Sequence, residues 1–174
     1  MILTLSFALA ATLAGVTMPD TATVGTEPVV LNGLGLREKY TIDIYVGGLY
    51  LRNPTRSGTA AIAADEPKRV VMQFIYRAVT RQQMLDTFYE GFGDAAKGAR
   101  ADSVAKMQSW VPADGVKRGD RIAFDYAPGA GTTMTLNGRA LGNIPGAEFM
   151  KLVFGIFLGP RPPTEALKAG LLGG

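Results

Sequence analysis

The chain has 174 residues, of which 47% are apolar and 19% are charged, and this composition predicts one globular domain. It carries 18 basic and 15 acidic residues, and the basic ones are mostly scattered, so we expect no nucleic-acid partner. Cysteine and histidine are both absent, which excludes thiolate nucleophiles, Ser-His and Cys-His relays and the usual zinc sites.

Residues 2–16 form an uncharged run rich in leucine and alanine. The run is short for a membrane span and is typical of the core of a signal peptide. Ala8-Leu9-Ala10 has the small residues of a cleavage site, although no lysine or arginine precedes the run. We therefore expect an exported protein, located in the periplasm, with no stable membrane span after signal removal. The alternative is that the run forms an apolar first strand or helix of the folded domain.

The next part of the sequence is typical of strands. Residues 15–31 alternate weakly between apolar and polar and contain two turn motifs, so they predict two short strands with a tight connection. Residues 40–51 are dense in β-branched and aromatic residues and predict a long strand. Within it, Gly47-Gly48 indicates a bulge or a close approach by another backbone or a ligand. Residues 52–58 predict a loop, and residues 69–79 predict a second long strand.

A helix is expected after this second strand. Thr80 and Gln83 form a capping-box pattern, so the helix begins at Arg81, runs for about three turns and ends at Gly91 and Gly93. Its predicted apolar stripe consists of Met84, Leu85, Phe88 and Tyr89. A second helical stretch is predicted over residues 95–110.

The last third predicts an antiparallel meander and two further helices. Three segments alternate in hydrophobicity and predict strands over residues 122–126, 134–136 and 139–144. Asn137-Gly138 is a strong hairpin motif between the last two. An apolar helix is expected over 146–159, and Thr164 is expected to cap a short final helix. Together these elements predict an α+β fold with an antiparallel sheet covered on one face by helices.

Arg37 is the first candidate for a binding residue. Gly33 and Gly35 allow the backbone to turn tightly or to approach a ligand, so the guanidinium could be presented into a crevice. Once partly desolvated, it would need a carboxylate, a phenolate or a similar partner. The alternative is an exposed loop arginine, or one in a weak surface bridge to Glu38 or Asp43.

Tyr45 and a set of large apolar side chains could complete such a site. The hydroxyl of Tyr45 could bind the same anion as Arg37, although a strand tyrosine more often only packs, and Tyr76 and Tyr126 share this ambiguity. The apolar set suits either a core or an adaptable pocket and comprises Met72, Phe74, Met84, Phe88, Phe149, Met150, Phe154 and Phe157. No GxGxxG, P-loop, GxSxG or paired-carboxylate motif is present, so we expect neither a metal nor a cofactor.

Three motifs carry a resemblance to a known family: LNGLGLREKYTIDIYVGGLYL, VTRQQM and FLGPRPPTEALKAGLLG. The sequence from about residue 15 to residue 174 resembles the bacterial chalcone isomerase-like proteins, relatives of plant chalcone isomerase and of plastid fatty-acid-binding proteins. The resemblance implies an open-faced β-sandwich with the ligand between a large sheet and a layer of helices. It also places residues 15–18 in the first strand, which moves the expected cleavage site to Ala10 or Ala11. We therefore expect a signal peptide over 1–11 and a single domain over 12–174.

The resemblance also implies roles for single residues. Arg37 corresponds to the arginine that holds a ligand's anionic oxygen, a phenolate in the isomerases and a carboxylate in the fatty-acid binders. Tyr45 replaces an isomerase threonine, and a tyrosine there is similar to the fatty-acid-binding branch. Met84 stands where isomerases keep a catalytic tyrosine, and it cannot donate a hydrogen bond to a developing enolate. Three more polar isomerase residues, a lysine, an asparagine and a threonine, correspond to Tyr76, Gly91 and Ile156.

We therefore expect an exported, non-catalytic protein that binds a small amphipathic ligand, a fatty acid or a similar anion. Arg37 and Tyr45 would hold the head group, and the tail would lie in an apolar pocket. The expected ligand-binding residues are Arg37, Tyr45, Tyr76, Thr80, Met84, Phe88 and Ile156. One alternative is an intramolecular lyase of chalcone isomerase type with Arg37 as oxyanion anchor, and another is an interaction module with a vestigial pocket. The oligomeric state stays open.

Overall fold

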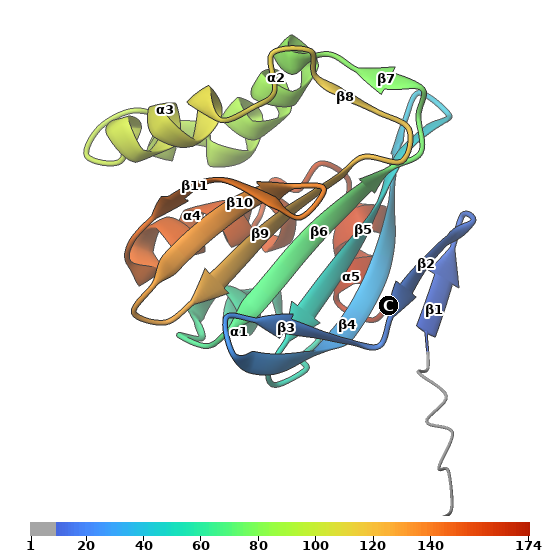
Figure 1. Ribbon diagram of the computed structural model, residues 1–174, viewed down its shortest axis with the longest axis horizontal. Coiled ribbons are helices and arrows are strands. Elements are labelled where there is room, and N and C mark those ends of the chain that lie inside the picture. Colours follow the sequence, from blue (N-terminus) through green and yellow to red (C-terminus); the bar gives the residue numbers. More distant parts are fainter. Residues whose placement is uncertain (1–9) are drawn as a thin grey trace, which may run out of the picture.

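The computed structural model describes residues 10–174, so most of the predicted signal peptide lies outside the described residues. Its centre is a seven-stranded antiparallel sheet in the order β11-β10-β9-β6-β5-β4-β3 (Figure 1). The strands of this sheet are β3 (Thr21–Val24), β4 (Glu27–Lys39), β5 (Ile42–Leu51), β6 (Lys68–Phe74), β9 (Arg121–Ala127), β10 (Gly131–Leu136) and β11 (Arg139–Ile144). Two further two-stranded sheets pair β1 (Ala10–Leu13) with β2 (Val16–Pro19) and β7 (Ala78–Val79) with β8 (Val116–Lys117).

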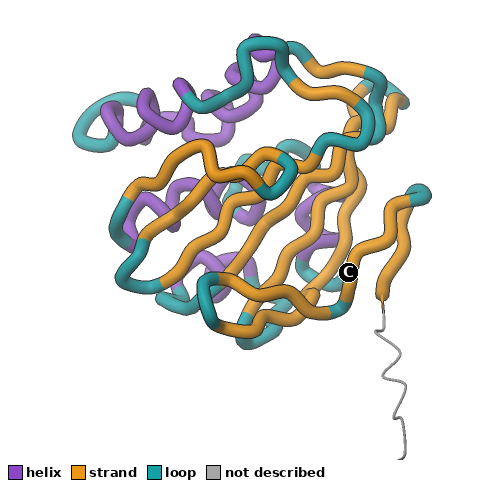
Figure 2. Tube along the Cα trace, in the orientation of Figure 1, coloured by secondary structure: helices purple, strands orange, loops and turns teal. Residues whose placement is uncertain are grey.

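The helices lie along one face and one end of the sheet. In Figure 1, α1, α4 and α5 lie behind the sheet, and α2 and α3 lie along its upper end. Figure 2 shows the same separation of strands and helices. The helices are α1 (Gly58–Ala63), α2 (Arg81–Phe92), α3 (Ala101–Ser109), α4 (Ala147–Leu158) and α5 (Glu165–Leu171), with a 3₁₀ turn over Gly93–Ala96. The predicted α+β fold with a large antiparallel sheet is confirmed.

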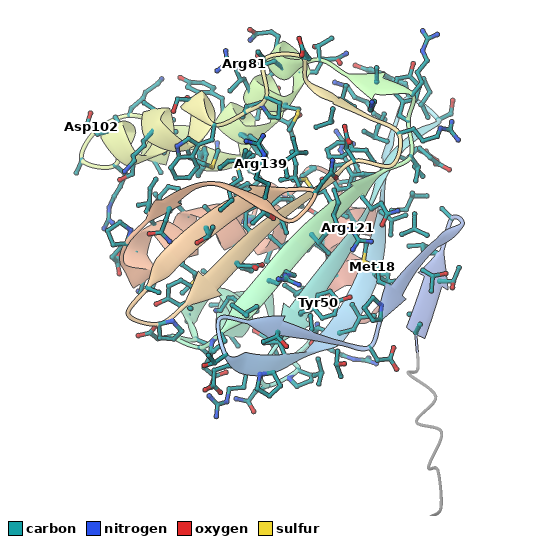
Figure 3. The ribbon with its side chains drawn as sticks, viewed as in Figure 1. Met18, Tyr50, Arg81, Asp102, Arg121 and Arg139 are labelled. Atoms are coloured by element: carbon teal, nitrogen blue, oxygen red, sulfur yellow. The ribbon has the colours of Figure 1, made fainter. Side chains whose placement is uncertain are left out.

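Strand alternation divides the core into two parts. Tyr45 and Leu49 of β5 point toward the helices and join the larger core, to which α4 contributes seven buried residues. Val46 and Tyr50 of the same strand point to the opposite face. There they pack against Met18 of β2, so the amino-terminal strands cover part of the second face; Figure 3 labels Met18 and Tyr50.

β4 differs from the predicted course of the chain. The two short strands predicted over 15–31 are present as β2 and β3, but the turn or ligand approach predicted at Gly33 and Gly35 is not, because the 13-residue strand β4 runs through both glycines. Helix α5 lies directly against this strand. A Cβ added to Gly35 would lie 2.3 Å from the carbonyl oxygen of Leu167, so this glycine admits a helix backbone rather than a ligand.

The glycine pair of β5 has a similar explanation. The pairing with β4 is continuous through Gly47 and Gly48, so no bulge is present there. A Cβ on Gly47 would meet the Leu167 side chain at 3.0 Å, and one on Gly48 would meet the Met18 sulfur at 2.5 Å. These glycines therefore allow close packing on both faces of the sheet.

Helix α2 confirms the predicted capping box. The Thr80 hydroxyl accepts a hydrogen bond from the Gln83 backbone N–H at 3.2 Å, and the Gln83 side chain accepts one from the Thr80 N–H at 2.9 Å. The helix continues through Gly91 to Phe92. The prediction that Tyr89 belongs to the apolar stripe was wrong: its side chain is 47% exposed, because it points away from the face that buries Met84 and Phe88.

Three other boundaries differ from the prediction. The strand predicted over 69–79 ends at Phe74, where the N–H groups of Ile75 and Tyr76 both donate to the carbonyl oxygen of Ile44 and bend the chain. The predicted loop over 52–58 ends in the unpredicted helix α1, whose first turn is capped by Ser57. The stretch over 95–110 is helical as α3 only from Ala101.

The last third of the chain follows the prediction. β9, β10 and β11 form the expected meander, with Asn137-Gly138 as the turn. The Thr164 hydroxyl accepts a hydrogen bond from the Leu167 N–H and caps α5. Among residues 10–174, no helix has the length and apolar character needed to cross a membrane.

Candidate ligand-binding site

A cavity of about 90 Å³ lies between the sheet and the helices. Its walls come from β4, β5 and β6 on one side and from α2 and α4 on the other. The residues around it are Arg37, Lys39, Ile44, Tyr45, Met72, Phe74, Tyr76, Ala78, Val79, Gln83, Met84, Thr87, Phe88, Ile156 and Phe157. No aspartate or glutamate is among them, so the polar part of the wall is basic or neutral.

Arg37 and Tyr45 are a cross-strand pair. They lie directly opposite each other on β4 and β5, so their side chains share the face of the sheet that contains the cavity. Arg37 is partly exposed, and its guanidinium donates a hydrogen bond to the backbone carbonyl oxygen of Glu38. Within residues 10–174 it forms no ion pair, so the predicted alternative of a bridge to Glu38 or Asp43 is absent there.

The hydroxyl of Tyr45 has no hydrogen-bond partner although the side chain is only 4% exposed. Burial raises the pKa of this hydroxyl, and the positive charge of Arg37 offsets only part of that effect. The group is therefore a neutral O–H donor at physiological pH. An unpaired buried hydroxyl beside a cavity is costly unless a ligand supplies the missing acceptor.

The deep wall of the cavity is apolar. Met84 and Phe88 lie one helical turn apart on the buried face of α2, and Ile156 and Phe157 come from α4. Phe124 of β9 packs behind this wall, with ring centroids 5.9 Å from Phe88 and 6.4 Å from Phe157. The cavity thus has a cation and a hydroxyl on the sheet and thioether, aromatic and aliphatic groups deeper in.

The structure brings six of the seven predicted site residues together around the cavity: Arg37, Tyr45, Tyr76, Met84, Phe88 and Ile156. Thr80 lies outside its wall, and its hydroxyl caps α2. Of the larger methionine and phenylalanine set, Met72, Phe74 and Phe157 also line the cavity. Phe149, Met150 and Phe154 are buried in the core instead.

Sequence reasoning missed several polar residues of the wall. Lys39 lies two residues after Arg37 on β4 and thus on the same face of the strand, a spacing that could have identified it. Gln83 and Thr87 flank Met84 and Phe88 at helical spacing on α2. In residues 10–174, no group of three or more acidic side chains is placed to hold a metal ion.

Comparison with solved structures identifies a protein of similar fold. The crystal structure of a fatty-acid binding protein from Arabidopsis thaliana superimposes with a TM-score of 0.76, over 94% of this chain and 96% of that one. The two sequences are 17% identical, so the likeness concerns the fold. No curated protein sequence matches this chain.

The sequence itself agrees with one family model over nearly its whole length. The matched region is residues 10–173, which includes every described strand and helix. The region also contains all residues of the cavity wall. The chain therefore belongs to the chalcone isomerase-like family.

Proposed function

We propose that this protein binds a fatty acid or a similar amphipathic anion without transforming it. The carboxylate accepts hydrogen bonds from Arg37 and from the Tyr45 hydroxyl, and the acyl chain extends along Met84, Phe88 and Ile156. A charge-assisted hydrogen bond contributes about 1.5–3 kcal/mol and each buried methylene about 0.8 kcal/mol. The chain thus supplies most of the affinity, and the head-group contacts set its direction.

One observation carries the proposal. The buried Tyr45 hydroxyl lacks an acceptor, and its cross-strand neighbour Arg37 forms no ion pair within residues 10–174. An anionic oxygen between them would satisfy both groups at once. The fatty-acid binding protein of similar fold supports the same class of ligand.

A long acyl chain needs more room than the present cavity of about 90 Å³. Ligand pockets usually enclose about 300–1,000 Å³. Met72 and Met84 stand on opposite walls, and methionine side chains adapt their shape at small cost. We expect these residues to change rotamer and α2 to move outward when the ligand enters.

The alternative function is an isomerase of chalcone isomerase type, with Arg37 holding the substrate oxygen. Met84 supports binding over catalysis, because a thioether cannot donate to an enolate, and losing one such donor typically slows a reaction about 100- to 1,000-fold. Naringenin chalcone consumed faster with the protein than in buffer alone would favour the isomerase.

The binding function is tested by displacement of a fluorescent fatty acid with palmitate. Arg37→Met should weaken binding by about 10- to 150-fold, the equivalent of one charge-assisted hydrogen bond. The matched control is Arg56→Met, which removes an exposed arginine that is not part of the cavity wall. If wild type and Arg37→Met bind palmitate equally, or neither binds it, the proposal is wrong.

We further propose that the protein is exported, because of the apolar run over residues 2–16. Folded strand β1 begins at Ala10, so a cut at Ala10 or Ala11 would fall inside or next to it. Mass spectrometry of the mature amino terminus, taken from the periplasmic fraction, tests this. An uncleaved chain found only in the cytoplasm would contradict it.

A further inference from the structure

The turn between β4 and β5 lies at the mouth of the cavity. Arg37, Lys39 and Ile44 of this hairpin line the cavity, together with Ala78 and Val79 of β7. Figure 1 shows the turn projecting beside β7 and the connection that follows β8. We give the name mouth surface to the exposed basic and large apolar residues of this region, which are Lys39, Tyr40, Ile42, Arg77, Lys117 and Arg118; Glu38, Thr41 and Asp43 of the hairpin are exposed as well.

The tip of the mouth surface exposes large apolar side chains. Tyr40 is 86% exposed and Ile42 is 42% exposed. Among residues 10–174, only one other large hydrophobic side chain, Tyr89 on α2, is exposed. Two of these three exposed apolar side chains therefore lie on the hairpin that lines the cavity through Arg37, Lys39 and Ile44.

The backbone of this turn is also unusual. Tyr40 and Thr41 both have positive φ, at 50° and 66°, as the two central residues of a tight hairpin turn. Asn-Gly is the favoured pair for this geometry, and the β10–β11 hairpin uses it at Asn137-Gly138, with φ of 50° and 81°. A β-branched residue with positive φ is strained. The chain thus holds a tyrosine and a threonine where a less strained pair would form the same turn.

Charge is distributed unevenly around the turn. Arg37 and Lys39 lie on its cavity side, whereas Glu38 and Asp43 face each other across the strands at the intervening position. The adjoining segments add Arg77, Lys117 and Arg118, all exposed. Asp120 is also nearby, where it accepts hydrogen bonds from the Lys117 N–H and from Asn137. Among residues 10–174, none of the basic residues of the mouth surface forms an ion pair.

From these features we infer that the mouth surface docks on an anionic lipid bilayer. Tyrosine is favoured at the depth of lipid head groups, and basic side chains are attracted to anionic lipids. Docking would place the open end of the cavity against the membrane, from which a fatty acid could pass between lipid and protein without crossing water. The role in ligand transfer rests on the proposed function, but docking itself is measured without the ligand.

Docking is tested by cosedimentation of the full chain with vesicles of phosphatidylcholine alone or of phosphatidylcholine and phosphatidylglycerol at 3:1. Tyr40→Asn combined with Thr41→Gly installs the favoured turn pair, so this variant should fold at least as well as wild type. It should bind the anionic vesicles at least fivefold more weakly. The matched control is Tyr89→Ala, which removes the exposed tyrosine that lies outside the mouth surface and should leave binding unchanged.

A second variant tests the charges. The double variant Lys117→Gln/Arg118→Gln removes two cations that are not part of the cavity wall. It should weaken binding to the anionic vesicles about 25-fold, or about fivefold for each cation removed. Equal binding of wild type to neutral and anionic vesicles would overturn the inference, because the basic residues would then play no part. No binding to either kind of vesicle would also overturn it and would point to a protein partner instead. Unchanged binding by Tyr40→Asn/Thr41→Gly would overturn it as well.

Palmitate displacement in vesicle-free buffer separates this inference from the proposed function. Tyr40, Thr41, Lys117 and Arg118 are not part of the cavity wall, so both double variants should bind palmitate as wild type does. Arg37→Met should show the opposite result, with weakened palmitate binding. If wild type binds vesicles but does not bind palmitate, the proposed fatty-acid ligand is wrong and the docking inference stands.

Discussion

Tyr45 combines two properties that seldom occur together in a core residue. Its ring packs edge-on against Phe74, with centroids 5.5 Å apart, as expected for a buried aromatic pair. Its hydroxyl, however, has no partner. The ring therefore stabilises the fold while the hydroxyl destabilises it, and the two contributions can be separated by removing one oxygen atom.

Tyr45→Phe should stabilise the unliganded protein and weaken ligand binding. Removing an unsatisfied buried hydroxyl should raise the free energy of unfolding by about 1–2 kcal/mol, whereas losing one donor to the carboxylate should weaken palmitate binding about tenfold. Urea unfolding and palmitate displacement measure the two effects. A destabilised variant with unchanged palmitate affinity would mean that the hydroxyl is structural.

Lys68 is a second buried polar residue, remote from the cavity wall. It is 1% exposed, and its ammonium donates to the carbonyl oxygens of Ala61, at 2.5 Å, and Ala64, at 2.6 Å, at the end of α1. Burial lowers the pKa of Lys68 to about 8, and the charges of Glu66 and Asp65 offset only part of this effect. The lysine therefore holds α1 against the sheet, and the free energy needed to keep its ammonium group buried depends on pH.

The free energy of unfolding should rise with pH between about 8 and 10. The pKa of Lys68 is about 8 in the folded protein against 10.5 in the unfolded chain, so in this window the unfolded chain binds more protons and each rise in pH favours folding. The window ends near 10, because burial raises the pKa of Tyr126 from 10.0 to about 12, which lowers stability above that pH.

Urea unfolding at several pH values, with Lys68→Met, checks this dependence. The substitution should flatten the rise between pH 8 and 10. Lys97→Met, which removes an exposed lysine, should leave it intact. An equal slope in wild type and Lys68→Met would show that another group is responsible.

At the scale of elements, the contact between α5 and β4 determines how closely the two layers approach. Gly33 and Gly35 on the strand and Gly170 on the helix leave room for backbone against backbone. A Cβ on Gly170 would lie 2.3 Å from the carbonyl oxygen of Leu34. This close contact fixes the spacing between the helix and the sheet at Gly35, which lies two residues before Arg37 on β4. It thereby fixes the position of the head-group end of the cavity.

Two glycine substitutions should therefore act in opposite directions. Gly35→Ala should destabilise the protein by about 3 kcal/mol, because the added methyl group overlaps the Leu167 carbonyl oxygen and the backbone must move. Gly155→Ala in α4 meets no atom within 4 Å and should stabilise it by about 0.5–1 kcal/mol through helix propensity. Thermal unfolding of both variants measures the difference, and similar effects from both would contradict the packing argument.

At the scale of the whole molecule, the cavity lies between the sheet and the α2–α4 wall rather than within one element. Ligand binding therefore requires that both layers are folded and correctly spaced. The unfolded chain cannot hold Arg37 and Tyr45 opposite each other. Binding and folding should consequently be linked, with the ligand binding only the native state.

Palmitate at 100 times its dissociation constant should stabilise the native state by about 2.7 kcal/mol. For a chain of this length, this corresponds to a rise in the melting temperature of about 5–10 °C. Differential scanning calorimetry should show one cooperative transition that moves as a whole. Arg37→Met at the same palmitate concentration should move much less, and an unchanged melting temperature in wild type would count against a native-state ligand.

The local features of this protein were predictable because they depend on neighbouring residues. The Thr80 and Thr164 caps, the Asn137-Gly138 turn and the alternation in β9 follow from hydrogen bonds and periodicities within a few residues. Six of the seven proposed site residues line the cavity, but their selection depended on the family resemblance as well as on residue chemistry. Lys39 was missed, although its spacing from Arg37 was available in the sequence.

The sequence by itself determined the fold class, the order of most elements and the chemistry available to a site that has no cysteine or histidine. Only the tertiary structure decided that Gly33 and Gly35 accommodate α5, that β6 bends after Phe74, and that the Tyr45 hydroxyl is left without a partner. Each of these depends on segments far apart in the chain. Sequence periodicity reports which face of an element is buried, but it does not report what that face contacts.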